Sequence, residues 1–150
     1  MNELIDRFEE WNHFVNQIKE ANWDLALGEG KWTIHDVVSH IMFWDLYFFK
    51  EAVQRIVNGQ TLTLKHIDFD LFNKDAMKKG KNLSKEELVS RTIAIRDQLL
   101  EYIRSMNEEQ WTAQYVDADG NPFEVRQYLK DFIWHDEHHM NQLKGVLGIA

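Results

Sequence analysis

Apolar residues recur at three- and four-residue steps over four long stretches of the chain, which is the spacing of one face of an α-helix. Four amphipathic helices of this length are typical of a four-helix bundle. We therefore predict an all-α fold in a single domain that spans residues 1–150. The predicted helices cover about residues 2–22, 33–57, 84–106 and 122–145.

Polar residues indicate where three of these helices begin. Thr33 is followed three residues later by Asp36, and Ser84 by Glu87, and both pairs have the spacing of a capping box. Pro122 follows the turn-forming stretch Asp-Ala-Asp-Gly-Asn and suits the first turn of the last helix.

Residues 60–82 are the least periodic part of the chain. They predict a long crossover between the second and third helices, with a short helix around Phe69–Lys79. The stretch Thr61–Leu64 alternates like a strand, but it is short and we predict an extended loop there.

Composition narrows the range of functions. A net charge of −8 without a basic block argues against nucleic-acid binding. The longest apolar run, Ile41–Phe49, contains Asp45 and is too short to span a bilayer, and the N-terminus has no apolar export segment, so we predict a cytoplasmic protein that does not bind membranes. The chain has no cysteine, so any thiol chemistry would use a sulfur carried by a small molecule.

The second predicted helix is apolar around most of its circumference. Met42, Phe43, Leu46 and Phe49 lie outside its main stripe, and one bundle hides only part of such a helix. This pattern predicts a homodimer.

Three histidines are candidate metal ligands. His135 and His139 are separated by one helical turn on the apolar side of the last helix, about 40° apart when each residue advances about 100°. His40 lies on the second helix within an apolar stretch. Three imidazoles from two helices would hold a zinc, nickel, copper or iron ion and leave positions open for water or substrate. The alternative is a hydrogen-bonded polar layer inside the bundle without a metal.

Two familiar metal motifs are excluded. A gluzincin site needs Glu directly after the first histidine, whereas Asp136 stands there and Glu137 faces away. A di-iron bundle needs two Glu-x-x-His motifs, and the one match, from Glu10 to His13, is predicted to face solvent.

Other polar and aromatic residues of the second helix are open to two interpretations. Asp45 shares a side with apolar residues, so it is predicted to be a partly buried carboxylate with a structural partner, and the alternative is a functional role. Trp44 and Tyr47 follow His40 along the same ridge, where they would line a substrate pocket or pack in the core.

The chain resembles the DinB/YfiT-like superfamily. The resemblance rests on Gly30–Ile41, which opens with Lys-Trp-Thr and contains His40, and on the His-x-x-x-His pair of His135 and His139. It extends to Phe69–Asn73 and to the capped helix from Ser84, and so covers nearly the whole chain.

This resemblance implies a four-helix bundle, often dimeric, with zinc or nickel held by His40, His135 and His139. It also implies a small-molecule substrate, because characterised relatives include transferases and isomerases that use low-molecular-weight thiols.

Three functions stay open at this point. The first is a metal-dependent S-transferase that joins a small thiol to an electrophilic small molecule. The second is a metal-dependent hydrolase, with His138 or a nearby carboxylate as proton acceptor. The third is a non-catalytic bundle that binds small molecules, for example in a stress response.

Overall fold

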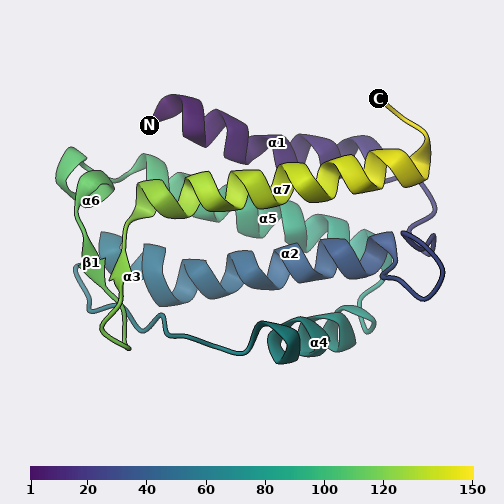
Figure 1. Cartoon of the computed structure of the whole chain (residues 1–150). Coiled ribbons are helices and arrows are strands. Elements are labelled where there is room, and N and C mark those ends of the chain that lie inside the picture. The colour runs from purple at the N-terminus through teal and green to yellow at the C-terminus, as the bar shows by residue number, and fades with distance from the viewer.

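The computed structural model describes residues 1–150 and is built mainly of helices (Figure 1). Four long helical segments make the bundle: α1 (Asn2–Ile18); α2 (Ile34–Phe48) continued by the π-helical turn η1 (Phe49–Val53) and by α3 (Gln54–Val57); α5 (Lys85–Arg104); and α7 (Val125–Leu147). The other elements are α4 (Phe69–Gly80), α6 (Glu108–Thr112) and a hairpin of β1 (Tyr115–Val116) and β2 (Pro122–Phe123).

The predicted starts of the second and third helices are confirmed. The Thr33 side chain accepts from the Asp36 backbone and the Asp36 side chain accepts from the Thr33 backbone, and Ser84 and Glu87 make the same reciprocal pair. The short helix predicted in the crossover is present as α4, and Thr61–Leu64 is an extended loop.

The first helix is shorter than predicted. It ends at Ile18 rather than near Asn22 because the chain turns there, and the indole of Trp23 donates to the Ile18 carbonyl at 2.9 Å. The helix therefore stops at Ile18, whose carbonyl accepts from the buried side chain of Trp23.

The start of the last helix was predicted wrongly. Pro122 lies in β2, where it pairs with Val116, and α7 begins at Val125. The Asp117 side chain accepts from two backbone amides of the turn, and this closes a hairpin instead of starting a helix. The helix ends at Leu147, two residues beyond the predicted Gly145, at the left-handed cap Gly148 (φ 66°).

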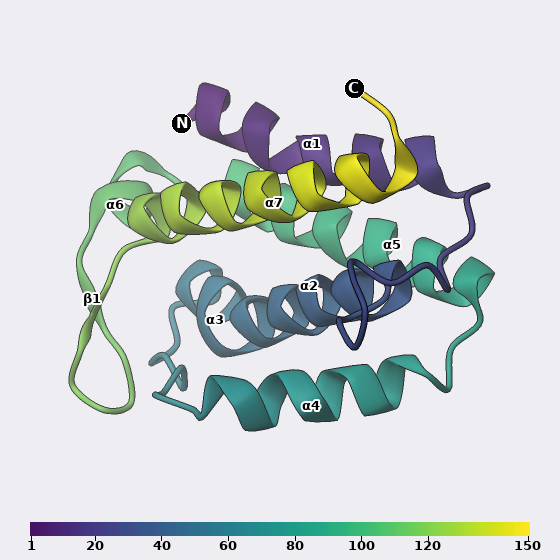
Figure 2. The same cartoon turned by 45° about the vertical axis from the view of Figure 1, so that its right-hand side comes forward.

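The crossover sets the direction of the third bundle helix. In Figure 2, α4 runs back along α2, so that α5 starts at the end of the bundle where α2 also starts. Pairings of Asp45 with Arg96 and of Phe49 with Tyr102 show that α2 and α5 are parallel. Helix α1 packs on α5 and α7, and α2 packs on α4, α5 and α7.

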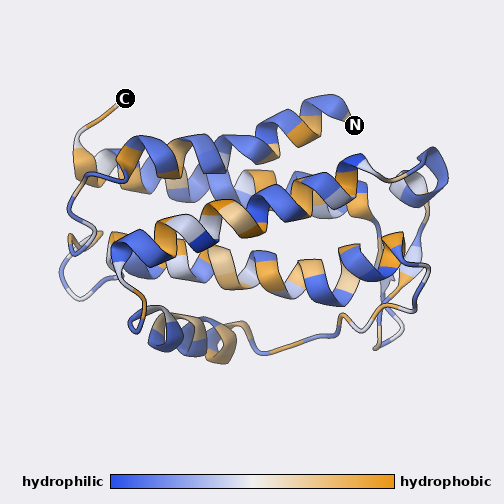
Figure 3. Ribbon diagram, turned by 180° about the vertical axis from the view of Figure 1, so that it is seen from behind, coloured by the Kyte–Doolittle hydropathy of each residue, from blue (hydrophilic) through white to orange (hydrophobic).

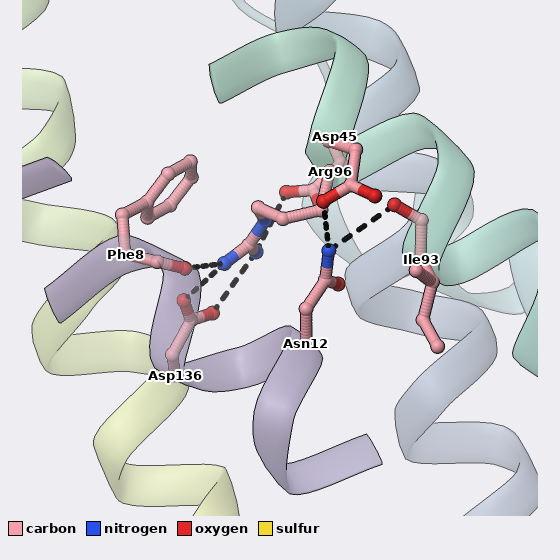
Figure 4. Close-up of polar contacts among 7 residues, drawn as sticks. Phe8, Asn12, Asp45, Ile93, Arg96 and Asp136 are labelled. Atoms are coloured by element: carbon pink, nitrogen blue, oxygen red, sulfur yellow. Dashed lines mark hydrogen bonds and ion pairs between the residues drawn. The ribbon is translucent and has the colours of Figure 1, made fainter. Parts of the chain in front are cut away.

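The core consists of two apolar clusters, one toward each end of the bundle. Each long helix carries both hydrophilic and hydrophobic residues, as the amphipathic pattern predicted (Figure 3). The interior also contains polar residues. The largest group of them consists of Asp45, Arg96 and Asp136, which we call the ion network (Figure 4). The predicted partly buried Asp45 is thus fully buried, and its partner is Arg96.

Much of the apolar surface of the second helix is covered within the chain itself. Met42 and Phe49 are buried, and Phe43 and Leu46 line a groove against α4. The homodimer inferred from this surface stays a prediction. No helix has both the length and the apolar character required to cross a bilayer.

Candidate metal centre

The structure brings the three candidate ligands together. His40 on α2 and His135 and His139 on α7 form a group, here called the histidine triad, in which one ring nitrogen of each residue lies within 4.8 Å of the others. The Nε2 atoms of His40 and His135 are 3.0 Å apart. His135 and His139 share one ridge because four residues make about one turn of an α-helix.

This spacing fits a metal ion. Imidazole nitrogens bind zinc at about 2.0–2.1 Å, which places tetrahedral ligand atoms about 3.3 Å from one another. The His40–His135 separation is close to this value, and the ligand nitrogens of all three histidines lie within 4.8 Å of one another. The set contains no other ligand, so an ion held there keeps open coordination positions.

Burial keeps the triad uncharged. Desolvation lowers the pKa of His40 to about 4, although its hydrogen bond to Asn73 acts in the opposite direction. Desolvation and the neighbouring histidines lower the pKa of His135 to about 3, and burial also lowers the pKa of His139. All three rings are therefore neutral at pH 7, which is the form that binds a metal.

The second ring nitrogens have different partners. His40 Nδ1 lies 2.7 Å from Asn73 Oδ1, and His139 Nδ1 lies 2.9 Å from Gln142 Oε1. The Nδ1 atom of His135 is buried and has no partner. The bonds to Asn73 and Gln142 hold two rings by their outer nitrogens and leave the inner nitrogens free to accept a cation.

An open cleft reaches the triad at His139. It has a volume of about 480 Å³ and is lined by Leu27, Gly30, Lys31, Trp32, His139 and Gln142. The centres of the Trp32 and His40 rings are 5.1 Å apart, so the loop that carries Trp32 also borders His40. A larger cleft of about 560 Å³, beside Trp23 and Lys85, contains none of the triad.

Trp44 and Tyr47 have structural contacts. The Trp44 indole donates to Asn73 Oδ1 at 2.8 Å, and its ring lies 4.0 Å from that of Phe72 on α4. The Tyr47 hydroxyl donates to the Lys65 carbonyl at 3.0 Å. Neither residue lines the cleft at His139, so this cleft does not support the interpretation in which Trp44 and Tyr47 line a substrate pocket.

The carboxylates next to the triad in sequence have other partners. Asp136 pairs with Arg96 in the core, and Glu137 pairs with Arg7 at the surface at 2.8 Å. His138 stacks on the exposed ring of Trp134. Of the predicted proton acceptors, His138 alone lies close to the triad without an acidic or basic partner.

Three functional or supporting residues were missed by sequence reasoning. Asn73 lies in the aperiodic crossover, where the sequence gives no signal for its contact with α2. Gln142 follows His139 by three residues, a helical spacing that does predict a contact. Arg96 lies between Thr92 and Leu99 on the buried side of α5, so a lone arginine at a core position was the available signal.

Comparisons with known proteins agree with this fold. The chain is 23% identical over 133 residues to a candidate metal-dependent hydrolase of Oceanobacillus iheyensis, covering 89% of this chain and 75% of that protein. YfiT from Bacillus subtilis, described as a probable metal-dependent hydrolase with an unusual four-helix bundle topology, superposes with a TM-score of 0.79 at 16% identity, covering 99% and 88% of the two chains.

A mycothiol-dependent maleylpyruvate isomerase has the same fold, with a TM-score of 0.74 at 14% identity. The match covers 95% of this chain but 60% of the isomerase. The sequence model of the DinB superfamily matches residues 2–143, almost the full length. The resemblance found in the sequence is therefore confirmed, and the chain belongs to the DinB superfamily.

Proposed function

We propose that this protein is a divalent-metal-dependent S-transferase that joins a low-molecular-weight thiol to an electrophilic small molecule. His40, His135 and His139 would hold the ion, zinc or nickel. The observation that carries the proposal is the convergence of three neutral imidazoles without a carboxylate among them. Three neutral ligands leave the full charge of a divalent ion in place.

That charge is the chemistry the ion supplies when bound: it favours the thiolate form of a thiol over the protonated form. The chain contributes no sulfur nucleophile of its own because it has no cysteine. A free thiol has a pKa of about 8.5 and ionises beside a cation without help from a strong base. The lack of a free carboxylate at the triad is therefore compatible with thiol transfer.

The cleft beside His139 suits a small cosubstrate. Its volume is in the range of about 300–1,000 Å³ that is usual for small-molecule sites. Lys31 supplies a positive charge at this cleft, and such a charge would attract an anionic thiol to an otherwise acidic protein.

The second candidate is a metal-dependent hydrolase, which the descriptions of the Oceanobacillus and Bacillus proteins favour. Hydrolysis needs a group that takes a proton from water. With Asp136 and Glu137 bound to arginines, that role would fall to His138. Turnover of an ester or amide substrate without added thiol would favour this candidate.

The experiment measures metal content and thiol dependence on the same preparation. Protein purified without a histidine tag or nickel column is assayed with a dinitrophenyl halide, using glutathione, cysteine and other small thiols in turn. We expect one bound divalent ion per chain and conjugation that is lost in His135→Leu. Bound metal with no thiol-dependent turnover would contradict the transferase proposal and leave the metal site intact.

The non-catalytic alternative is tested by ligand binding. If His139→Ala leaves the affinity for bound small molecules unchanged, while no thiol or ester is turned over, the protein is a binding bundle. Sedimentation at high concentration tests the predicted homodimer.

A further inference from the structure

One amide oxygen accepts two hydrogen bonds beside the triad. Asn73 Oδ1 lies 2.8 Å from the indole nitrogen of Trp44 and 2.7 Å from His40 Nδ1. An indole N–H is only a donor, so the atom that faces it is the amide oxygen and not the amide nitrogen. His40 Nδ1 must then carry a proton and donate to the same oxygen. His40 Nε2 is left with a lone pair directed at His135.

Asn73 does not come from the four-helix bundle. It belongs to α4, which packs against α2 (Figure 2). At the end of α4, Gly80 lies so close to Ser39 that an added Cβ would collide with the serine hydroxyl oxygen. This contact and the ring of Phe72 on Trp44 fix where α4 sits along α2.

The other histidines of the triad are held differently. His139 bonds to Gln142, which is exposed and lies on the same helix. His135 Nδ1 has no partner at all. Asn73 is therefore the one side chain that connects a triad histidine to a helix outside the bundle.

We propose that Asn73 is a positioning residue that holds His40 with its proton on Nδ1 and thereby couples the docking of α4 to metal binding. The inference rests on the metal site of the proposed function. The fixed proton leaves His40 Nε2 as an acceptor before any ion arrives, so metal binding requires no change of tautomer at His40. Because coupling is reciprocal, a bound ion also stabilises the docked position of α4.

The first test reads the tautomer of His40 in metal-free protein by nitrogen NMR of the imidazole ring. In the wild type we expect the proton on Nδ1. Asn73→Leu removes the acceptor and should abolish this preference, whereas Asn73→Asp replaces the amide oxygen by a carboxylate oxygen that still accepts, and should retain the proton on Nδ1. Trp44→Phe deletes the other donor and should leave the His40 signal in place.

The second test measures Zn²⁺ affinity by competition with a chelator. Loss of an outer hydrogen bond of this kind weakens metal binding by about 10–100-fold, which is the effect expected for Asn73→Leu. Asn73→Asp should bind at least as tightly as the wild type. Lys74→Leu introduces the same side chain one residue away on the exposed side of α4 and serves as the control for an added leucine, with the loss of one positive charge as its only other change.

Hydrogen exchange supplies a third measurement. We expect the amides of α4 to exchange more slowly with Zn²⁺ than without it in the wild type, and equally in Asn73→Leu. The inference is overturned if Asn73→Leu keeps both the tautomer and the affinity, or if Asn73→Asp folds and loses both. If the wild type binds no divalent ion, the proposed function fails, and the tautomer measurement still decides the role of Asn73.

Discussion

The ion network and the histidine triad are two groups of buried polar side chains that adjoin at His135 and Asp136. In the ion network, the five N–H groups of Arg96 all donate: to both oxygens of Asp45, to both oxygens of Asp136 and to the Phe8 carbonyl, at 2.7–3.5 Å. In the triad, two ring nitrogens face each other at 3.0 Å and a third buried nitrogen has no partner.

This difference is expected if the ion network is structural and the triad holds a metal ion, as proposed above. Arg96 is fully buried, but its charge is compensated: every N–H group of its guanidinium has an acceptor, and the centre of the Phe8 ring lies 3.8 Å away. Burial lowers the pKa of Arg96, but Asp136 and Asp45 outweigh it and raise that pKa above its ordinary value. In the triad, by contrast, His40 Nε2 is paired only with His135 Nε2, and His135 Nδ1 is buried without a partner, so its polar atoms are less completely satisfied than those of Arg96.

The largest effect is expected from Arg96→Met, which breaks the ion network. It leaves the carboxylates of Asp45 and Asp136 buried without a counter-charge, and removal of one partner from such a network costs about 3–5 kcal/mol. We expect a loss of this size in the free energy of unfolding measured with urea at pH 7.

A triple variant with Asp45→Leu and Asp136→Leu in addition should recover most of that stability, because no charge is then left buried. A loss below about 1 kcal/mol in the single variant would contradict the view that the ion network stabilises the fold.

The second prediction concerns the triad. A ligand at 100 times its dissociation constant stabilises the folded state by about 2.7 kcal/mol. We expect added Zn²⁺ to raise the melting temperature of the wild type correspondingly, and to have no effect on His135→Leu. In the absence of metal, His135→Leu should change the stability little, because removal of the buried unpaired Nδ1 offsets the loss of the contact with His40 Nε2. Equal stabilisation of both proteins by Zn²⁺ would place the ion elsewhere.

The third prediction uses pH. The pKa of His135 is about 3 in the folded protein and its ordinary value is 6.5, so between these values the unfolded chain binds a proton that the folded one does not. The stability of metal-free wild type relative to His135→Leu therefore rises with pH across this window, by up to about 1.4 kcal/mol per pH unit, and is constant above pH 6.5. Urea unfolding of both proteins from pH 4.5 to 8 measures this difference.

The ion network should give the opposite slope. Burial raises the pKa of Asp136 from 3.8 to about 7, despite the bonds to Arg96. Here the folded protein binds the extra proton, so the stability of the wild type relative to Asp136→Asn falls as pH rises from 3.8 to about 7. Slopes of the same sign for His135 and Asp136 would contradict the comparison.

Much of the helical fold could be predicted from the sequence because its signals are local. Apolar periodicity located the four long helices, and the capping boxes at Thr33 and Ser84 located two starts. The hairpin was missed because its strands have two residues each, too few to show alternation, and a proline before a helix is equally typical of a helix start. The capping box from Asn107 to Gln110 was a local signal for α6.

The triad could also be predicted from the sequence, because its signals are local: His135 and His139 are one turn apart, and His40 lies on an apolar stretch. Contacts between distant segments could not be predicted in this way. Asn73 reaches His40 through a crossover without periodicity, and Arg96 meets Asp45 and Asp136 only once three helices have packed. A charged residue on the buried stripe of α5 indicates a buried partner but does not say which one.

The smallest effect is expected from Glu137→Ala. Glu137 directly follows Asp136, but it faces the surface and pairs with Arg7 where both side chains are about half exposed (46% and 49%). Exposed ion pairs contribute about 0–1 kcal/mol, so unfolding in urea should change by less than that and Zn²⁺ affinity should not change. Since Asp136→Asn removes a neighbouring carboxylate that is buried, a similar effect of both variants would mean that burial does not distinguish these two side chains.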